Sequence, residues 1–115
     1  MKKTILVLIL FTISIMFIGC SNKITIGNQD AFAQCLTEKG VTMYGTEWCP
    51  HCQNQKEEFG DSFQYINFVD CDLSKGACKE AGIEGYPTWR IEGENYPGEQ
   101  NLYKLASLSG CIIEE

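Results

Sequence analysis

Trp48-Cys49-Pro50-His51-Cys52 follows a short apolar segment at residues 41–44 and precedes a segment with a helical pattern. Pro50 suits the first position of a helix, because its missing N–H would have no partner there and its φ is already helical. Cys49 is then predicted to be the N-cap residue, with the free N–H groups and the positive end of the helix dipole near its sulfur. Two thiols three positions apart on a first helical turn can form a disulfide. The stretch therefore predicts a strand, a redox-active Cys-x-x-Cys pair and a helix, in that order.

His51, the only histidine in the chain, lies between the two cysteines. An imidazole there can donate a hydrogen bond to the Cys49 sulfur or place a positive charge near it, and both effects stabilise the reduced form. If the Cys49 thiol ionised about four pH units below an ordinary thiol, the dithiol would gain roughly 3.4 kcal/mol at pH 7 and the reduction potential would rise by about 70 mV. The pair is thus predicted to be an oxidant, with Cys52 as the more buried resolving thiol. A structural disulfide or half of a zinc site is the alternative.

The N-terminal region has the layout of an export signal. Lys2 and Lys3 precede a mostly apolar run over residues 5–18, which is shorter than the roughly 20 residues of a membrane span. The following stretch, residues 17–20, resembles a bacterial lipoprotein box, although Phe17 replaces the usual Leu. The resemblance implies that Cys20 is lipidated. An uncleaved signal anchor, or ordinary cleavage with Cys20 left as a spare thiol, are the alternatives, and all three place the folded part outside the cytoplasm.

Composition supports an exported, acidic domain. Seven cysteines among 115 residues are typical of an oxidising compartment. Loss of residues 1–19 removes Lys2 and Lys3 and no acidic residue, so the net charge changes from −6 to −8. Such a surface argues against binding to nucleic acid or electrostatic docking on anionic lipid. A folded part of under 100 residues has a marginal core, so disulfides would matter to its stability.

Four parts are predicted along the chain: a lipoprotein-type signal peptide over residues 1–19, a tether over 20–28, a folded domain over 29–111 and a C-terminal tail over 112–115. Periodicity and capping signals divide the domain further. Helices are predicted over residues 29–39, 50–59, 74–81 and 100–109, strands over 41–44 and 65–69, and a hairpin over 88–96. The alternation of helices and strands predicts an α/β domain.

A Trp-Cys-x-x-Cys motif after a strand, and Tyr86-Pro87-Thr88 some 35 residues later before a hairpin and a last helix, resemble the thioredoxin fold. The resemblance covers roughly residues 24–111. It implies a central mixed four-stranded, or short five-stranded, sheet flanked by helices. It also implies that Pro87 is a cis-proline packed against the active-site pair, and that Trp48 and the backbone of Tyr86 contact an extended substrate segment. An ordinary trans turn at Pro87 is the alternative.

The wider pattern is more specific. Cys-Pro-His-Cys is similar to the motif of periplasmic disulfide oxidases, which implies oxidation. Together, residues 32–36, 44–52, 78–83 and 108–111 resemble the thioredoxin-like domain associated with bacterial homologues of vitamin K epoxide reductase. These 115 residues contain no membrane-embedded reductase domain, so a quinone-linked redox partner of that type is expected in trans. One departure is Met43, which stands where thioredoxins bury an acidic residue behind the active site; Glu47 is the candidate for a partial substitute.

The other four cysteines of the domain allow three pairings. We favour Cys71 with Cys78, which are close in sequence across a strand-to-helix turn, and Cys35 with Cys111, which lie at helix faces or ends. The chain-entropy account gives about 2.5 kcal/mol for the short loop and about 4.5 kcal/mol for the long one. Free buried thiols, or a redox relay through Cys71 and Cys78, are the alternatives.

The sequence thus predicts an extracytoplasmic thiol-disulfide oxidoreductase, anchored by lipid and facing the periplasm or cell exterior. It would mainly oxidise thiols of cysteine-containing exported proteins through a Cys49/Cys52 cycle, with that disulfide as its only redox group and no metal. A membrane-tethered reductase or isomerase of the same fold is one alternative. Another is a lipoprotein that binds a soft metal such as copper through Cys49 and Cys52, although no second histidine or methionine-rich segment accompanies the motif.

Overall fold

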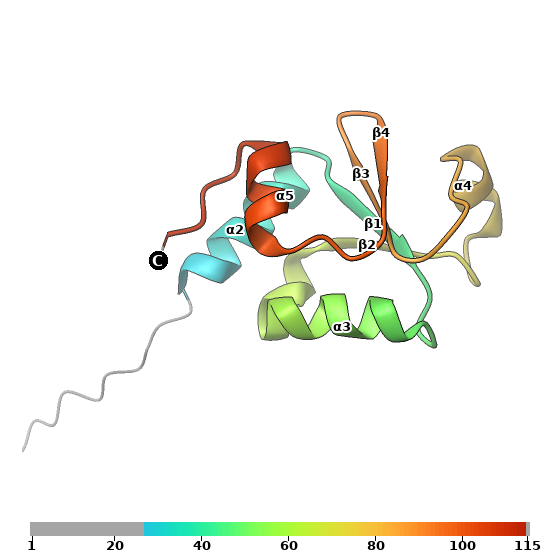
Figure 1. Cartoon of the computed structure of the whole chain (residues 1–115), viewed down its shortest axis with the longest axis horizontal. Helices are drawn as coiled ribbons and strands as arrows, with labels where there is room; N and C mark the ends of the chain where they lie inside the picture. Colours follow the sequence, from blue (N-terminus) through green and yellow to red (C-terminus); the bar gives the residue numbers. More distant parts are fainter. Residues whose placement is uncertain (1–26, 115) are drawn as a thin grey trace, which may run out of the picture.

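A mixed four-stranded sheet with helices around it makes up the described part of the chain, residues 27–114 of the computed structural model (Figure 1). Its helices are α2 (Gly27–Glu38), α3 (Pro50–Phe59), the 3₁₀ helix η1 (Gly60–Tyr65), α4 (Lys75–Glu80) and α5 (Leu102–Ser109). Its strands are β1 (Thr42–Gly45), β2 (Asn67–Asp70), β3 (Thr88–Ile91) and β4 (Glu94–Pro97). The strand order is β2-β1-β3-β4, with β1 parallel to β2 and antiparallel to β3. The predicted α/β class and mixed sheet are confirmed.

Several predicted boundaries are wrong. Helix α2 begins at Gly27, so the last two residues of the predicted tether are helical, and the rest of that tether, the signal peptide and Cys20 lie outside the described residues. Tyr65 was expected in a strand but ends the 3₁₀ helix, and β2 begins at Asn67. Gly60 ends α3 with φ +54°, and the turn that follows packs Phe63 edge-on against aromatic rings on both sides. This packing outweighs the β-propensity of Tyr65.

The last helix is shorter than its pattern predicted. Asn101 caps it, accepting a hydrogen bond from the Lys104 N–H at 2.8 Å, so α5 begins at Leu102 rather than at residue 100. Gly110 ends it in the left-handed region at φ +75°. Residues 98–101 are therefore a connecting loop between β4 and α5, and this loop passes the active-site helix.

Aromatic side chains hold α3 to the helix before it and to the sheet. Phe59, at the end of α3, stacks on Phe32 of α2 at 6.2 Å and lies 5.9 Å from Trp89 of β3, between ring centroids. All three are buried. Rings of this size supply much of the area that a small domain removes from water. They fix α3, and with it the cysteine motif, relative to β1 and β3.

Two disulfides join peripheral segments to this core. Cys35 of α2 is bonded to Cys111, just after α5, and Cys71, after β2, is bonded to Cys78 of α4. The Cα atoms of the pairs are 6.0 and 5.7 Å apart. These are the two pairs that the sequence analysis favoured. Because they span 76 and 7 positions, the chain-entropy account assigns the larger stabilisation to the first.

Candidate active site

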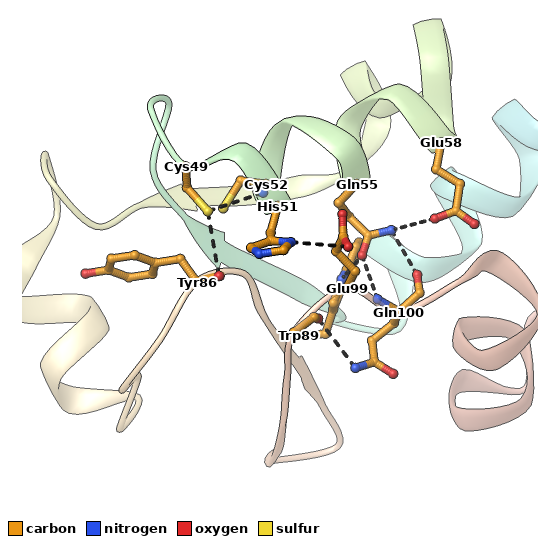
Figure 2. Close-up of polar contacts among 10 residues, drawn as sticks. Cys49, His51, Cys52, Gln55, Glu58, Tyr86, Trp89, Glu99 and Gln100 are labelled. Atoms are coloured by element: carbon orange, nitrogen blue, oxygen red, sulfur yellow. Dashed lines mark hydrogen bonds and ion pairs between the residues drawn. The ribbon is translucent and has the colours of Figure 1, made fainter.

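Cys49 is the N-cap residue of α3, and its sulfur and that of Cys52 are not bonded to each other in the structure. The Cys49 Sγ accepts a hydrogen bond from the Cys52 N–H at 3.3 Å and donates one to the carbonyl oxygen of Tyr86 at 3.6 Å (Figure 2). Pro50 occupies the first helical turn, as its geometry favours. A thiolate at this sulfur would keep the backbone donor and the favourable end of the helix dipole.

Cys52 is fully buried one turn further along α3. Burial raises the pKa of its thiol from 9.0 to about 12, and a hydrogen bond with Cys49 adds to this rise, while a backbone hydrogen bond from Thr46 opposes it. The Cys52 sulfur packs directly against Gly45, so that a Cβ added at Gly45 would stand 2.6 Å from Sγ. Cys52 therefore has the burial and the high pKa expected of a resolving thiol.

A lysine supplies positive charge on the inner side of this helix. Lys56 lies with its Nζ 4.3 Å from the ring centroid of Phe68 and 2.9 Å from a carboxylate oxygen of Glu47. Phe68 also borders the space beside Gly45 into which the Cys52 sulfur projects. The charge of Lys56 opposes the rise in the Cys52 pKa. Met43 is fully buried in the core, so no carboxylate comes from that position, and Glu47 meets the lysine instead.

The residues expected to contact substrate surround the Cys49 sulfur. The Tyr86–Pro87 peptide bond is cis and Pro87 is buried, while Tyr86 is exposed. Trp48 is 64% exposed, stands edge-on to the Tyr86 ring at 6.3 Å and donates from its indole N–H to Asp72 at 2.7 Å. An exposed aromatic surface thus lies beside a nearly buried nucleophile.

His51, which is expected to act on the Cys49 sulfur, contacts an acidic side chain from a loop distant in sequence. Its Nδ1 lies 3.4 Å from a carboxylate oxygen of Glu99, in the loop between β4 and α5 (Figure 2). The Cys49 sulfur forms hydrogen bonds with the Cys52 N–H and the Tyr86 carbonyl. The imidazole is therefore near the cysteine pair by sequence, and its direct hydrogen-bond partner is an acidic side chain.

Gln55 is a buried polar residue that the sequence analysis did not single out. Its Oε1 accepts hydrogen bonds from the Trp89 indole at 2.9 Å and the Gln100 N–H at 2.8 Å, and its Nε2 donates to the Gln100 carbonyl at 2.8 Å. One signal was available: the spacing of Cys52, Gln55 and Phe59 along α3 follows a single buried face. Glu99, in a loop, gave no periodic signal.

Between residues 27 and 114, no group of three or more histidine, cysteine or acidic side chains is arranged to hold a metal ion. None of the helices in that part has the length and hydropathy of a membrane span.

The profile of the thioredoxin family matches residues 23–108. The chain is 39% identical over 94 residues to the thiol-disulfide oxidoreductase LTO1 of Arabidopsis thaliana, covering 74% of this chain and 25% of that protein. It is 30% identical over 93 residues to the protein disulfide isomerase-like 5-1 of Oryza sativa subsp. japonica, covering 67% and 63%, and 32% identical over 73 residues to a protein disulfide-isomerase of Aspergillus niger, covering 56% and 14%.

The chain thus spans about a quarter of the plant oxidoreductase and less than two thirds of the rice protein. The family match covers most of the chain, and the relatives carry oxidoreductase and isomerase names, in agreement with two free thiols at the start of α3. The chain belongs to the thioredoxin family, and it is similar to parts of thiol-disulfide oxidoreductases and protein disulfide isomerases.

Proposed function

We propose that this chain mainly oxidises thiols of exported proteins through a Cys49/Cys52 cycle outside the cytoplasm. The observation that carries the proposal is the asymmetry of the pair. Cys49 caps α3 and accepts a backbone hydrogen bond, whereas burial raises the pKa of Cys52 to about 12. A thiol at a helix N-terminus is the more acidic and the better leaving group of such a pair.

In the proposed cycle, a substrate thiolate attacks the Cys49 sulfur of the oxidised pair. The Cys49–Cys52 bond breaks, a mixed disulfide forms at Cys49 and the electron pair goes to the Cys52 sulfur, which takes up a proton. A second substrate thiolate then attacks the substrate sulfur of the mixed disulfide and expels Cys49 as a thiolate. Two substrate thiols lose two electrons and become a disulfide, and the protein ends as the dithiol.

The surface beside Cys49 supports binding of an extended substrate segment. The Tyr86 carbonyl faces the Cys49 sulfur, and the side chains of Trp48 and Tyr86, which stand edge-on to each other, are both exposed. A peptide backbone pairing along the cis-proline loop would bring its cysteine to Cys49, as strand addition does at other peptide-binding sites. Replacement of Trp48 by Ala should then raise the KM for a cysteine-containing peptide more than it lowers kcat.

A lipid anchor at Cys20 and a membrane-bound, quinone-linked reoxidase of the vitamin K epoxide reductase type are parts of the same proposal. The signal-like N-terminus and the lipoprotein-like residues 17–20 support the anchor. Incorporation of labelled fatty acid into the wild-type chain, and its loss in Cys20→Ala, would support it. Equal labelling of both would overturn it.

The catalytic part of the proposal is tested with the purified oxidised protein and a reduced peptide that holds two cysteines. Stoichiometric conversion of the peptide to its disulfide, with appearance of two free thiols in the protein, is expected. Cys52→Ser should leave a stable mixed disulfide in the presence of peptide disulfide, and Cys49→Ser should not react. If the peptide remains reduced, the proposal that the protein is an oxidase is overturned.

A disulfide reductase or isomerase is the second candidate, because two of the compared relatives are named as protein disulfide isomerases. The two candidates differ in the redox state in which the pair is stable. Recovery of activity from a scrambled disulfide substrate, faster than oxidation of a reduced one, would favour the isomerase.

A further inference from the structure

Glu99 brings a carboxylate to the histidine of the cysteine motif from another part of the chain. Its Oε2 lies 3.4 Å from the His51 Nδ1, across 48 positions of sequence (Figure 2). The His51 side chain is 68% exposed and that of Glu99 38%. An exposed imidazole without this partner could rotate freely about its side-chain bonds.

The loop that carries Glu99 is anchored by a buried amide. Gln55 binds both backbone polar groups of Gln100, the residue directly after Glu99, with two hydrogen bonds of 2.8 Å. His51 and Gln55 are four positions apart in α3, and residues with this spacing lie on the same side of a helix. One face of α3 therefore fixes the loop backbone through Gln55 and meets its carboxylate through His51.

This contact would oppose the effect that His51 is expected to have on the cysteine pair. The Glu99 carboxylate is the partner of the His51 Nδ1 and therefore orients the ring. The partner of one ring nitrogen also fixes whether the other nitrogen donates or accepts a hydrogen bond. It also places a negative charge beside any positive charge on the imidazole, which reduces the field that a Cys49 thiolate would experience. Building on the proposed oxidoreductase function, we propose that Glu99 is a positioning residue that acts through His51 to moderate the oxidising power of the Cys49/Cys52 pair.

The charged and titratable groups to consider around His51 are Glu99 from the loop and the two thiols of its own helix. The Glu99 carboxylate also has an effect that opposes this moderation. It favours the protonated imidazole, whose positive charge stabilises a nearby thiolate. Near pH 5.5, about one unit below the ordinary histidine pKa of ~6.5, an imidazole is mostly charged with or without such a partner. The comparison is therefore made at that pH, where the moderating effect remains.

The test is the equilibrium of the full-length protein with glutathione for the wild type, Glu99→Gln, His51→Val and the double variant. Glu57→Gln, on an exposed position of the same helix, is the control for loss of one negative charge. Glu99→Gln should make the pair about threefold more oxidising, the size expected of an exposed ion pair, which is about 14 mV at ~30 mV per tenfold. In the His51→Val background, the same change should have less than half this effect.

The proposal is overturned if Glu99→Gln leaves the equilibrium constant unchanged or lowers it. It is also overturned if the change is equally large without His51, or if Glu57→Gln reproduces it, since Glu99 would then act only through the net charge. Glu99→Asp, which keeps the charge, should return at least part of the wild-type value, whereas a merely structural role would not move the potential. A low wild-type potential would refute the oxidase proposal and leave these differences between variants measurable.

Discussion

Gly45 lies directly against the sulfur of Cys52, so that a Cβ added to this strand residue would stand 2.6 Å from Sγ and 3.3 Å from the Phe68 ring. Real Cβ atoms do not approach a sulfur so closely, and a core at native density has little room to relax. Strand β1 and helix α3 are thus as close at the active site as a glycine permits.

Replacement of Gly45 by Ala should displace the Cys52 sulfur and destabilise the dithiol form by about 1 to 3 kcal/mol, the usual cost of overpacking. Urea unfolding of the reduced protein measures this. Gly76→Ala is the matched control, because its added Cβ meets nothing within 4 Å. Equal stability of Gly45→Ala and Gly76→Ala would show that the sulfur has another position available.

Gln55 should be among the most sensitive polar residues of the domain. Gln55→Ala leaves the Trp89 indole N–H and the Gln100 N–H without their acceptor, and each unsatisfied buried donor costs about 1 to 3 kcal/mol. A loss of roughly 2 to 5 kcal/mol in the free energy of unfolding is expected. Gln53→Ala, on an exposed position of the same helix, should change it by under about 0.5 kcal/mol. Similar losses for both variants would contradict the anchoring role of Gln55.

The high pKa of Cys52 makes the stability of the dithiol form depend on pH. The thiol is favoured as the neutral form in the folded protein, with a pKa of about 12 against 9.0 in the unfolded chain. Its contribution is fully present below about pH 9 and is lost as the pH rises from 9 towards 12, because the unfolded chain ionises first. The loss approaches about 1.4 kcal/mol per pH unit.

Urea unfolding at several pH values between 8 and 11 measures this loss, with Cys52→Ala as the reference that carries all other titrating groups. The reduced wild type should lose stability relative to Cys52→Ala above pH 9. Parallel curves for the two proteins would mean that Cys52 ionises in the folded protein as easily as in the unfolded chain.

Lys56 should assist the step in which Cys52 leaves as a thiolate. In Lys56→Met the Cys52 pKa should rise further, because the positive charge that opposes the rise is gone. We expect reduction of the protein disulfide by glutathione to slow by about threefold, since Coulombic support from a part-exposed lysine is modest. Lys79→Met, in α4, is the control. An unchanged rate in Lys56→Met would remove Lys56 from the mechanism.

Local sequence signals located the fold and the cysteine pair. Pro50 at the start of a polar helix after an apolar strand, and Tyr86-Pro87 before a hairpin, are short-range patterns that hardly depend on tertiary contacts. The cis bond and the burial of Pro87 followed the family resemblance. Boundaries were less certain where packing decides, as at Tyr65, whose strand-like sequence is held in a 3₁₀ turn.

Long-range polar contacts could not be predicted in the same way. The contact between His51 and Glu99 depends on how the loop after β4 passes α3, and no periodicity reports that path. The packing of the Lys56 side chain on Phe68 likewise joins two distant elements and has no local sequence signal. Sequence patterns report which face of an element is buried, and less reliably which side chains from distant elements meet there.

The reduction potential of the Cys49/Cys52 pair, measured by titration of the wild-type protein against glutathione, tests the central claim most directly. If the pair oxidises substrate thiols, its potential should lie about 70 mV or more above that of thioredoxin, which is about −270 mV, and so at roughly −200 mV or above. A value in that range, towards the −120 mV of a strong disulfide oxidase, supports oxidation of substrate thiols. A value near −270 mV would contradict it and identify the pair as a reductant.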